Sequence, residues 1–227
     1  MNKDSSKISD CTIDVSEIFH SLQGESSFAG LPCCFIRLAG CNLRCAYCDT
    51  EYALTKENSI EMRISEIVRK ISSFNTKLVE ITGGEPLAQK NVFELMESLI
   101  SNGFKILLET NGSYSIGDIP EIVTTIMDCK CPSSGESEKM NYANFSLLTT
   151  GDEVKFVIAD EKDYKYAINI IEKYKLAEKQ IEILFSAVSG ISPSFPGELA
   201  NWITEDNLPV RFQLQIHKII WNDAKGK

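Results

Sequence analysis

Short apolar runs alternate with amphipathic segments along most of this chain. Apolar residues spaced three and four apart give residues 61–74 one apolar face, which predicts a helix. The same kind of pattern predicts further helices over 91–102, 163–175 and 197–206. Runs rich in Val, Ile, Leu and Phe predict strands over 34–40, 77–82, 104–110, 124–130, 153–160, 181–188 and 210–221.

The predicted strands are mostly apolar from end to end and are separated by helices, which is the pattern of a parallel sheet covered by helices. The chain is therefore predicted to be α/β, either as an open sheet or as a partial barrel. Both arrangements gather ligands at the carboxyl ends of the strands. We expect one domain over 1–227, in which the polar segment 131–144 is a surface loop or a short ordered insertion.

Composition narrows the classes of function. The 227 residues carry a formal charge of −9, with 32 acidic and 23 basic side chains, which argues against nucleic-acid binding. No apolar run approaches the ~20 residues of a transmembrane helix, and the start MNKDSSKISD lacks the apolar segment of a secretory signal. We therefore expect a cytoplasmic protein with no membrane partner. Its eight cysteines would stay reduced, as metal ligands, reactive groups or buried side chains.

Polar and glycine-rich stretches follow four of the predicted strands. They are GCNLRCAYCDT at 40–50, TGGEP at 82–86, ETNG at 109–112 and DCK at 128–130. The carboxyl ends of parallel strands meet at one edge of a sheet, so these stretches are expected to lie together. The sequence therefore predicts one site at that edge.

Cys41, Cys45 and Cys48 form a group of three, whereas a structural zinc site normally takes four ligands. An iron–sulfur cluster fits better, because each iron takes one thiolate and three thiolates leave one iron free for another ligand. The remaining cysteines offer no second closely spaced pair of this kind and are interpreted mainly as packed or incidental side chains: Cys11, Cys33, Cys34, Cys129 and Cys131.

The spacing C-x3-C-x2-C, with Tyr47 before the last cysteine, resembles the signature of the radical S-adenosylmethionine superfamily. The stretch GGEP at 83–86 resembles its second motif, a glycine-rich turn whose backbone approaches the methionine amino group. The resemblance implies a partial (β/α)6-type barrel with shortened helices. It also implies a 4Fe-4S cluster held by Cys41, Cys45 and Cys48, with S-adenosylmethionine on the open iron.

Within that superfamily the chain resembles the 7-carboxy-7-deazaguanine synthases almost from end to end. The resemblance is weakest over 131–150 and at the extreme C-terminus. It is carried by residues 18–50 and by shorter stretches, with matches at Leu22, Gln23, Gly24, Glu25, Arg37, Asp49, Thr50, Thr82, Glu109, Thr110, Asn111, Gly112 and residues 215–218.

This resemblance implies a carbon–nitrogen lyase whose small-molecule substrate is 6-carboxy-5,6,7,8-tetrahydropterin. Arg37 would bind the substrate carboxylate with two donors. Glu25 and Glu109 would accept hydrogen bonds from the pterin N–H groups, and Gln23 and Thr82 would supply mixed contacts. The implied substrate set is completed by Leu22, Gly24 and His217.

The resemblance also implies cofactor contacts. Thr50 would be a Mg²⁺ ligand, since magnesium prefers oxygen ligands and retains waters. The stretch DCK at 128–130 replaces the family's frequent Ser-Pro-Lys, so contacts there are expected to come mainly from backbone. The C-terminal residues 221–227 overrun the ending of some relatives, so no terminal carboxylate contact is carried over. S-adenosylmethionine would contact Tyr47, Cys48, Asp49, Gly84, Asp128, Cys129, Lys130, Phe185, Ser186, Ala187 and Val188.

The implied reaction begins when an electron from the cluster cleaves S-adenosylmethionine and produces a 5′-deoxyadenosyl radical. The radical takes hydrogen from C6 of the pterin, the ring contracts with the help of Mg²⁺, ammonia leaves and the radical is re-formed. The product, 7-carboxy-7-deazaguanine, belongs to queuosine or other 7-deazapurine biosynthesis. The implied partners are an electron donor such as flavodoxin and a second subunit in a homodimer.

Several alternatives remain open at the level of sequence. Glycyl-radical-enzyme activases share the cysteine spacing but act on a protein. A zinc- or cluster-binding module with a structural or electron-carrying role would neither cleave S-adenosylmethionine nor bind a pterin. Arg37 could form a surface ion pair, although its position inside an apolar run argues against this. Asp49 and Thr50 could cap a turn, and His217 could be a structural histidine.

Overall fold

The computed structural model describes residues 11–222, 224 and 226. The strands in this part of the chain form one sheet in the order β3-β1-β2-β4-β5-β6-β7-β8-β9. They are β1 Thr12–Leu22, β2 Pro32–Leu38, β3 Ile60–Arg63, β4 Leu78–Gly83, β5 Lys105–Thr110, β6 Thr124–Asp128, β7 Glu153–Ile158, β8 Glu182–Ala187 and β9 Arg211–Gln213.

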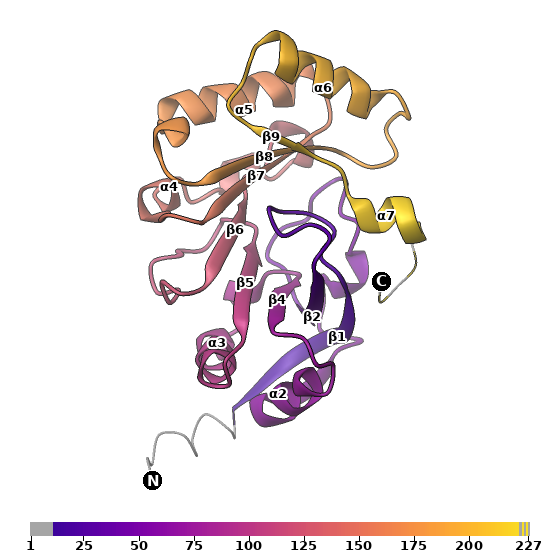
Figure 1. The fold of residues 1–227 in the computed structure, drawn as a ribbon, viewed down its shortest axis with the longest axis vertical. Coiled ribbons are helices and arrows are strands. Elements are labelled where there is room, and N and C mark those ends of the chain that lie inside the picture. The colour runs from indigo at the N-terminus through magenta and orange to yellow at the C-terminus, as the bar shows by residue number, and fades with distance from the viewer. Residues whose placement is uncertain (1–10, 223, 225, 227) are drawn as a thin grey trace.

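Helices connect these strands. Figure 1 shows α2 and α3 at one end of the molecule and α5 and α6 at the other, with the strands between them. The α-helices are α2 Ile64–Ser72, α3 Val92–Ser101, α4 Asn144–Leu147, α5 Glu161–Lys173, α6 Phe195–Glu205 and α7 Ile216–Trp221. Short 3-10 helices are η1 Glu51–Ala53, η2 Pro86–Ala88, η3 Pro132–Ser134, η4 Ser137–Lys139 and η5 Leu176–Glu178.

Every strand pair from β2 to β9 is parallel, whereas β1 runs antiparallel to both β2 and β3. The α/β partial-barrel prediction is confirmed by this parallel, helix-connected sheet. None of the helices in the described residues has the length and apolar character to span a membrane.

β1 was not predicted, most predicted boundaries lie within about two residues of the structure, and two differ by more in their consequences. Residues 60–63 are a strand that pairs with residues 12–15 of β1, so the helix predicted from residue 61 begins at Ile64. The prediction of a strand over 210–221 is wrong beyond Gln213, because the chain turns there into α7. That helix begins where the Ile216 N–H donates to the Gly24 carbonyl, 3.0 Å away, instead of to a neighbouring strand.

The polar segment 131–144 is an ordered insertion, the second of the two predicted alternatives. It contains η3 and η4 and buries Cys131, Ser134 and Glu136. At the end of the insertion, the fully buried Asn144 forms hydrogen bonds with the loop after β5. The Asn144 amide donates to the carbonyls of Gly112 at 3.1 Å and Tyr114 at 2.7 Å.

The two faces of the sheet bury different kinds of side chain. Side chains on the outer face pack against the helices as the main apolar core. On the inner face a smaller group, which we call the inner cluster, consists of Cys33, Phe35, Leu78, Leu107 and Ile126 with Phe19 and Phe28 packed against it. Toward the carboxyl ends of these strands, and on the neighbouring strand β7, the inward residues are polar or charged: Arg37, Thr82, Glu109, Asp128 and Lys155.

The loop between β1 and β2 crosses the inner side of the sheet and joins distant strands. The Ser26 N–H donates to Gln213 Oε1 on β9 at 2.8 Å. The Ser27 N–H and hydroxyl donate to the buried Glu153 carboxylate on β7. This loop therefore spans the open side of the curved sheet.

Replacing Asn144 with alanine should lower the free energy of unfolding by about 1–3 kcal/mol, because buried backbone carbonyls lose their donor. Urea denaturation of purified protein measures this change. The matched control is Asn102→Ala, whose amide bonds the Ser98 carbonyl at an exposed helix end and should cost about 0.5 kcal/mol or less. Equal losses in the two variants would contradict a structural role for Asn144.

Candidate active site

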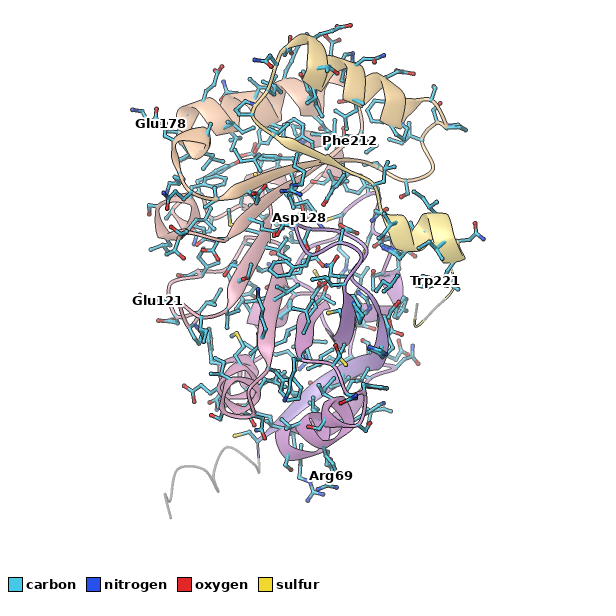
Figure 2. All side chains as sticks on the ribbon, viewed as in Figure 1. Arg69, Glu121, Asp128, Glu178, Phe212 and Trp221 are labelled. Carbon is cyan, nitrogen blue, oxygen red and sulfur yellow. The ribbon has the colours of Figure 1, made fainter. Side chains whose placement is uncertain are left out.

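A cavity of about 660 Å³ lies at the carboxyl ends of the parallel strands. Asp128, labelled in Figure 2, lies near the middle of the molecule, where β6 ends, and it lines this cavity. The four stretches expected to meet at one edge of the sheet all contribute to the lining. The predicted position of the site relative to the strands therefore matches the observed cavity.

The loop that carries the three clustered cysteines is held from two sides. On one side Gly40 N donates to the Ala53 carbonyl at 2.8 Å. On the other side the insertion over 131–144 accepts two backbone donors, Arg44 N on Glu136 Oε1 at 2.6 Å and Ala46 N on the Ser134 carbonyl at 3.0 Å. These hydrogen bonds fix the loop between η1 and the insertion.

The cysteines of the chain divide by burial. Cys41, Cys45 and Cys48 line the cavity and are partly exposed, whereas the other cysteines are buried or lie away from it. No group of three His, Cys, Asp or Glu side chains in the described ranges converges on a single ion position. An iron–sulfur cluster does not require such convergence, because each of its irons takes its own thiolate. The three cavity thiols therefore fit a cluster better than a single ion.

The GGEP stretch holds the second wall of the cavity against the cysteine loop. A Cβ on Gly84 would collide with the Gly40 carbonyl, so only glycine allows the two backbones to approach this closely. The fully buried Glu85 accepts from Thr110 Oγ1 at 2.8 Å and from Asn111 N at 2.7 Å. Burial raises the pKa of Glu85 to about 7 in spite of these bonds.

Arg37 lines the cavity next to an aromatic floor. Its Nε atom donates to Glu17 Oε1 at 2.8 Å, and the Tyr52 hydroxyl donates to the same oxygen at 2.6 Å. The guanidinium also lies over the Phe19 ring, 5.8 Å from its centroid. The two terminal nitrogens of Arg37 have no hydrogen-bond partner among the described residues, so they can bind a carboxylate of a ligand.

Lys155 is the main link between the acidic residues of the cavity. Its buried Nζ contacts Glu109 Oε1, Glu25 Oε2 at 3.0 Å and, more distantly, Asp128 Oδ2 at 3.9 Å. Burial alone would raise the pKa of Glu109, but the charge and hydrogen bond of Lys155 lower it to about 2. Thr82 Oγ1 donates to the other oxygen of Glu109 at 2.9 Å. Glu109 is therefore an ionised acceptor.

The C-terminal segment covers one rim of the cavity. Gln215 Nε2 donates to Glu25 Oε1 at 2.8 Å, and Lys218 Nζ binds Asp49 Oδ2 at 2.7 Å. Burial opposes ionisation of Asp49, yet the bond to Lys218 lowers its pKa to about 2. His217 lies directly against Gly24, where a Cβ would collide with its ring.

The structure brings most of the predicted site residues together. Of those assigned from the sequence, only Cys129, Phe185 and Ser186 do not line the cavity. Phe185 points to the helix side of β8, where its ring packs edge-on against Phe156 at 5.5 Å. The residues that do line the cavity are Cys41, Cys45, Cys48, Tyr47, Asp49, Thr50, Gly84, Asp128, Lys130, Ala187, Val188, Leu22, Gln23, Gly24, Glu25, Arg37, Thr82, Glu109 and His217.

Two charged residues of the cavity, Glu80 and Lys155, were not predicted from the sequence. Each lies inside an apolar strand, at positions where alternation directs it to the inner face. A charge within an apolar run was the argument against a surface ion pair for Arg37, which the family resemblance had singled out, and the same signal would have found both.

Replacing Gly84 with alanine should displace the cysteine loop, because the added methyl group meets the Gly40 carbonyl. We expect unfolding at lower urea concentration, with a loss of about 2–4 kcal/mol, and less iron bound after anaerobic reconstitution. Gly197→Ala is the control, since its Cβ would meet nothing within 4 Å. Normal iron content and stability in Gly84→Ala would show that the close approach is not required.

Replacing Lys155 with methionine should lower the free energy of unfolding by about 3–5 kcal/mol near neutral pH, because buried carboxylates lose their cation. Because the pKa of Glu109 is below its ordinary value of 4.5, ionised Glu109 stabilises the folded wild type at pH values above 4.5. This stabilisation is lost as the pH falls toward about 2. The difference between wild type and variant should therefore shrink in acid. The control Lys165→Met breaks only an exposed pair with Glu161 and should cost about 0.5 kcal/mol or less.

Comparison with known proteins agrees with this geometry. The sequence matches the radical SAM superfamily over residues 35–199. The computed structure resembles the crystal structure of QueE from Escherichia coli, with a TM-score of 0.72 at 20% identity over 93% of this chain and 98% of that chain. At this identity the structural likeness concerns the fold alone.

Two curated relatives are more similar in sequence. The 7-carboxy-7-deazaguanine synthase of Koribacter versatilis is 41% identical over 94% of this chain and all of its own length. The enzyme of the same name from Chlorobaculum tepidum is 45% identical over 94% of this chain and 97% of its own. The cavity and these similarities together show that the chain belongs to the 7-carboxy-7-deazaguanine synthase family of the radical SAM superfamily.

Proposed function

We propose that this protein is a carbon–nitrogen lyase that converts 6-carboxy-5,6,7,8-tetrahydropterin to 7-carboxy-7-deazaguanine with loss of ammonia, in queuosine or other 7-deazapurine biosynthesis. The observation that carries the proposal is one cavity that is lined both by three thiols and by Arg37, Glu25 and Glu109. Similarity to curated 7-carboxy-7-deazaguanine synthases along nearly the whole chain supports it.

Membership of the superfamily implies a 4Fe-4S cluster and S-adenosylmethionine. When bound, they supply one-electron chemistry that starts a radical reaction. The residues proposed to hold the cluster are Cys41, Cys45 and Cys48. The glycine turn at Gly84 packs against the cysteine loop and lines the same cavity, where its backbone is proposed to approach the cofactor.

The protein's own side chains bind and orient the substrate. The free nitrogens of Arg37 are suited to the substrate carboxylate. The ionised Glu109 and the neighbouring Glu25 are suited to accept from ring N–H groups. The aromatic pair Phe19 and Phe35, stacked at 4.8 Å, forms an apolar floor that excludes water beneath the ring.

A magnesium ion is part of the proposal. Thr50 lines the cavity, and its hydroxyl bonds Asp49 Oδ1 at 3.0 Å. A hydroxyl oxygen at this position, completed by substrate carboxylate and water, is a ligand set that Mg²⁺ accepts. The remaining cofactor contacts proposed for S-adenosylmethionine are those of the cavity residues Tyr47, Asp49, Asp128, Lys130, Ala187 and Val188.

The assembly and location of the protein are also proposals. Exposed apolar side chains near the C-terminus, Ile191, Leu214, Ile219 and Ile220, support a homodimer. The reaction needs a one-electron reductant, which supports a donor such as flavodoxin. Eight free cysteines, three of them needed as thiolates, suit a reducing compartment such as the cytoplasm.

Anaerobic reconstitution with iron and sulfide, followed by reductant, S-adenosylmethionine and carboxytetrahydropterin, should produce the deazaguanine chromophore. Cys45→Ala should lose cluster absorbance and product, because one iron loses its thiolate. Cys11→Ala, which changes a cysteine outside the cavity, should retain both. Cofactor cleavage without ring contraction, or a colourless zinc protein, would contradict the proposed reaction.

A further inference from the structure

Glu80 is a carboxyl group at the bottom of the cavity, and the proposed reaction gives it no role. It lies on β4 in register with Phe35 on β2 and Leu107 on β5, both members of the inner cluster. Its side chain lines the cavity, yet the residue is only 3% exposed. An ionisable group therefore lies where the apolar floor meets the polar wall.

The hydrogen bonds of the Gln23 amide determine which oxygen of the Glu80 carboxyl group is an acceptor. Gln23 Oε1 accepts from the backbone N–H of Glu25, so its amide nitrogen must point the other way. That nitrogen donates to Glu80 Oε2 at 2.5 Å. Glu80 Oε2 is therefore an acceptor, whereas Oε1 has no hydrogen-bond partner among the described residues.

The charges around Glu80 do not favour a carboxylate. Lys155 makes ion pairs with Glu25 and Glu109, and Glu80 makes none with any lysine or arginine of the described part of the chain. The groups that face it from neighbouring elements are the carboxylates of Glu25 and Glu109, the ammonium group of Lys155 and the buried thiol of Cys33. Burial first, and the charge of Glu109 second, raise the pKa of Glu80 to about 8, against the lowering effects of the Gln23 hydrogen bond and the Lys155 charge.

We propose that Glu80 is held as a neutral carboxylic acid on the cavity floor, where it orients the Gln23 amide and donates its O–H to an acceptor atom of a heterocyclic ligand. The acid proton lies on Oε1, because Oε2 already accepts from Gln23. The identity of the ligand as a pterin rests on the proposed function, whereas the protonation state of Glu80 does not.

Two carboxyl groups of one cavity then differ in protonation state and in hydrogen-bonding role. Glu109 is ionised beside Lys155 and only accepts, whereas Glu80 is neutral and donates. A ligand ring that carries an N–H donor beside a carbonyl or imine-type acceptor satisfies both groups. A ring with two donors leaves the Glu80 O–H without an acceptor, so Glu80 contributes to specificity.

The protonation state is tested by infrared difference spectroscopy of the cluster-loaded protein under anaerobic conditions. We expect wild type at pH 7 to show a protonated-carboxyl C=O signal from Glu80 that disappears as the pH rises through about 8, in addition to that of Glu85, whose pKa is about 7. The wild-type spectrum minus the Glu80→Gln spectrum isolates the Glu80 band, which should be retained in the control Glu97→Gln, where the changed carboxyl is exposed on α3. Absence of the band from this difference spectrum at pH 7 would overturn the proposal.

The ligand contact is tested by calorimetry of the same protein with S-adenosylmethionine and carboxytetrahydropterin but no reductant, so that no turnover occurs. Glu80→Gln keeps a neutral donor and should bind within about threefold of wild type at pH 7. Glu80→Met should bind about tenfold or more weakly, because Gln23 and the ligand both lose a partner. Above pH 8 the affinity of wild type should fall more steeply than that of Glu80→Gln.

Equal affinity in wild type, Glu80→Gln and Glu80→Met would overturn the contact with the ligand. Failure of all three proteins to bind the pterin would instead overturn the proposed function, and the infrared band would still decide the state of Glu80. Circular dichroism of each variant separates these outcomes from misfolding, and Glu80→Gln, which preserves the shape and the bond to Gln23, keeps the test valid if Glu80→Met is unstable.

Discussion

The ion pairs of Lys155 with Glu25 and Glu109 hold the polar end of the barrel together. The three residues come from β7, the loop after β1 and β5, so one ammonium group joins segments that are far apart in sequence. Each carboxylate would be costly to bury alone, and the cation makes their clustering tolerable. The Glu25 and Glu109 carboxylates, which can accept hydrogen bonds from a ligand in this cavity, are therefore held in place by the Lys155 ammonium group.

Along the strands the inner face of the sheet changes from apolar to polar, and the cavity lies at the polar end. On β2 the inward residues run from Cys33 and Phe35 to Arg37, and on β5 they run from Leu107 to Glu109. The apolar part fills the barrel and excludes water, while the polar part begins where the parallel strands end. The barrel therefore has a closed floor and an open, charged mouth.

Much of this architecture could be predicted from the sequence, because apolar strands separated by helices specify a parallel sheet and place polar stretches at one edge. The N-terminal strand β1 escaped prediction because its antiparallel partners, β2 and β3, are set by long-range pairing rather than by its own pattern. The last segment was predicted as one strand but is a strand only over Arg211–Gln213, since the alternation of 210–221 does not reveal that Ile216 bonds to Gly24. The charges of Glu80 and Lys155 inside apolar strands could have marked both for the inner face, whereas their partners on other strands could not be read from the sequence.

The ordered insertion over 131–144 has a consequence for how the protein acquires iron. Its Glu136 carboxylate and Ser134 carbonyl already satisfy the backbone donors of Arg44 and Ala46, on either side of Cys45. These bonds restrict the conformations of the loop that carries the cysteines, so less conformational entropy is left to lose when its thiols bind a ligand. Under the proposed cluster ligation, a segment remote from the cysteine motif in sequence would thus hold the ligand loop in place.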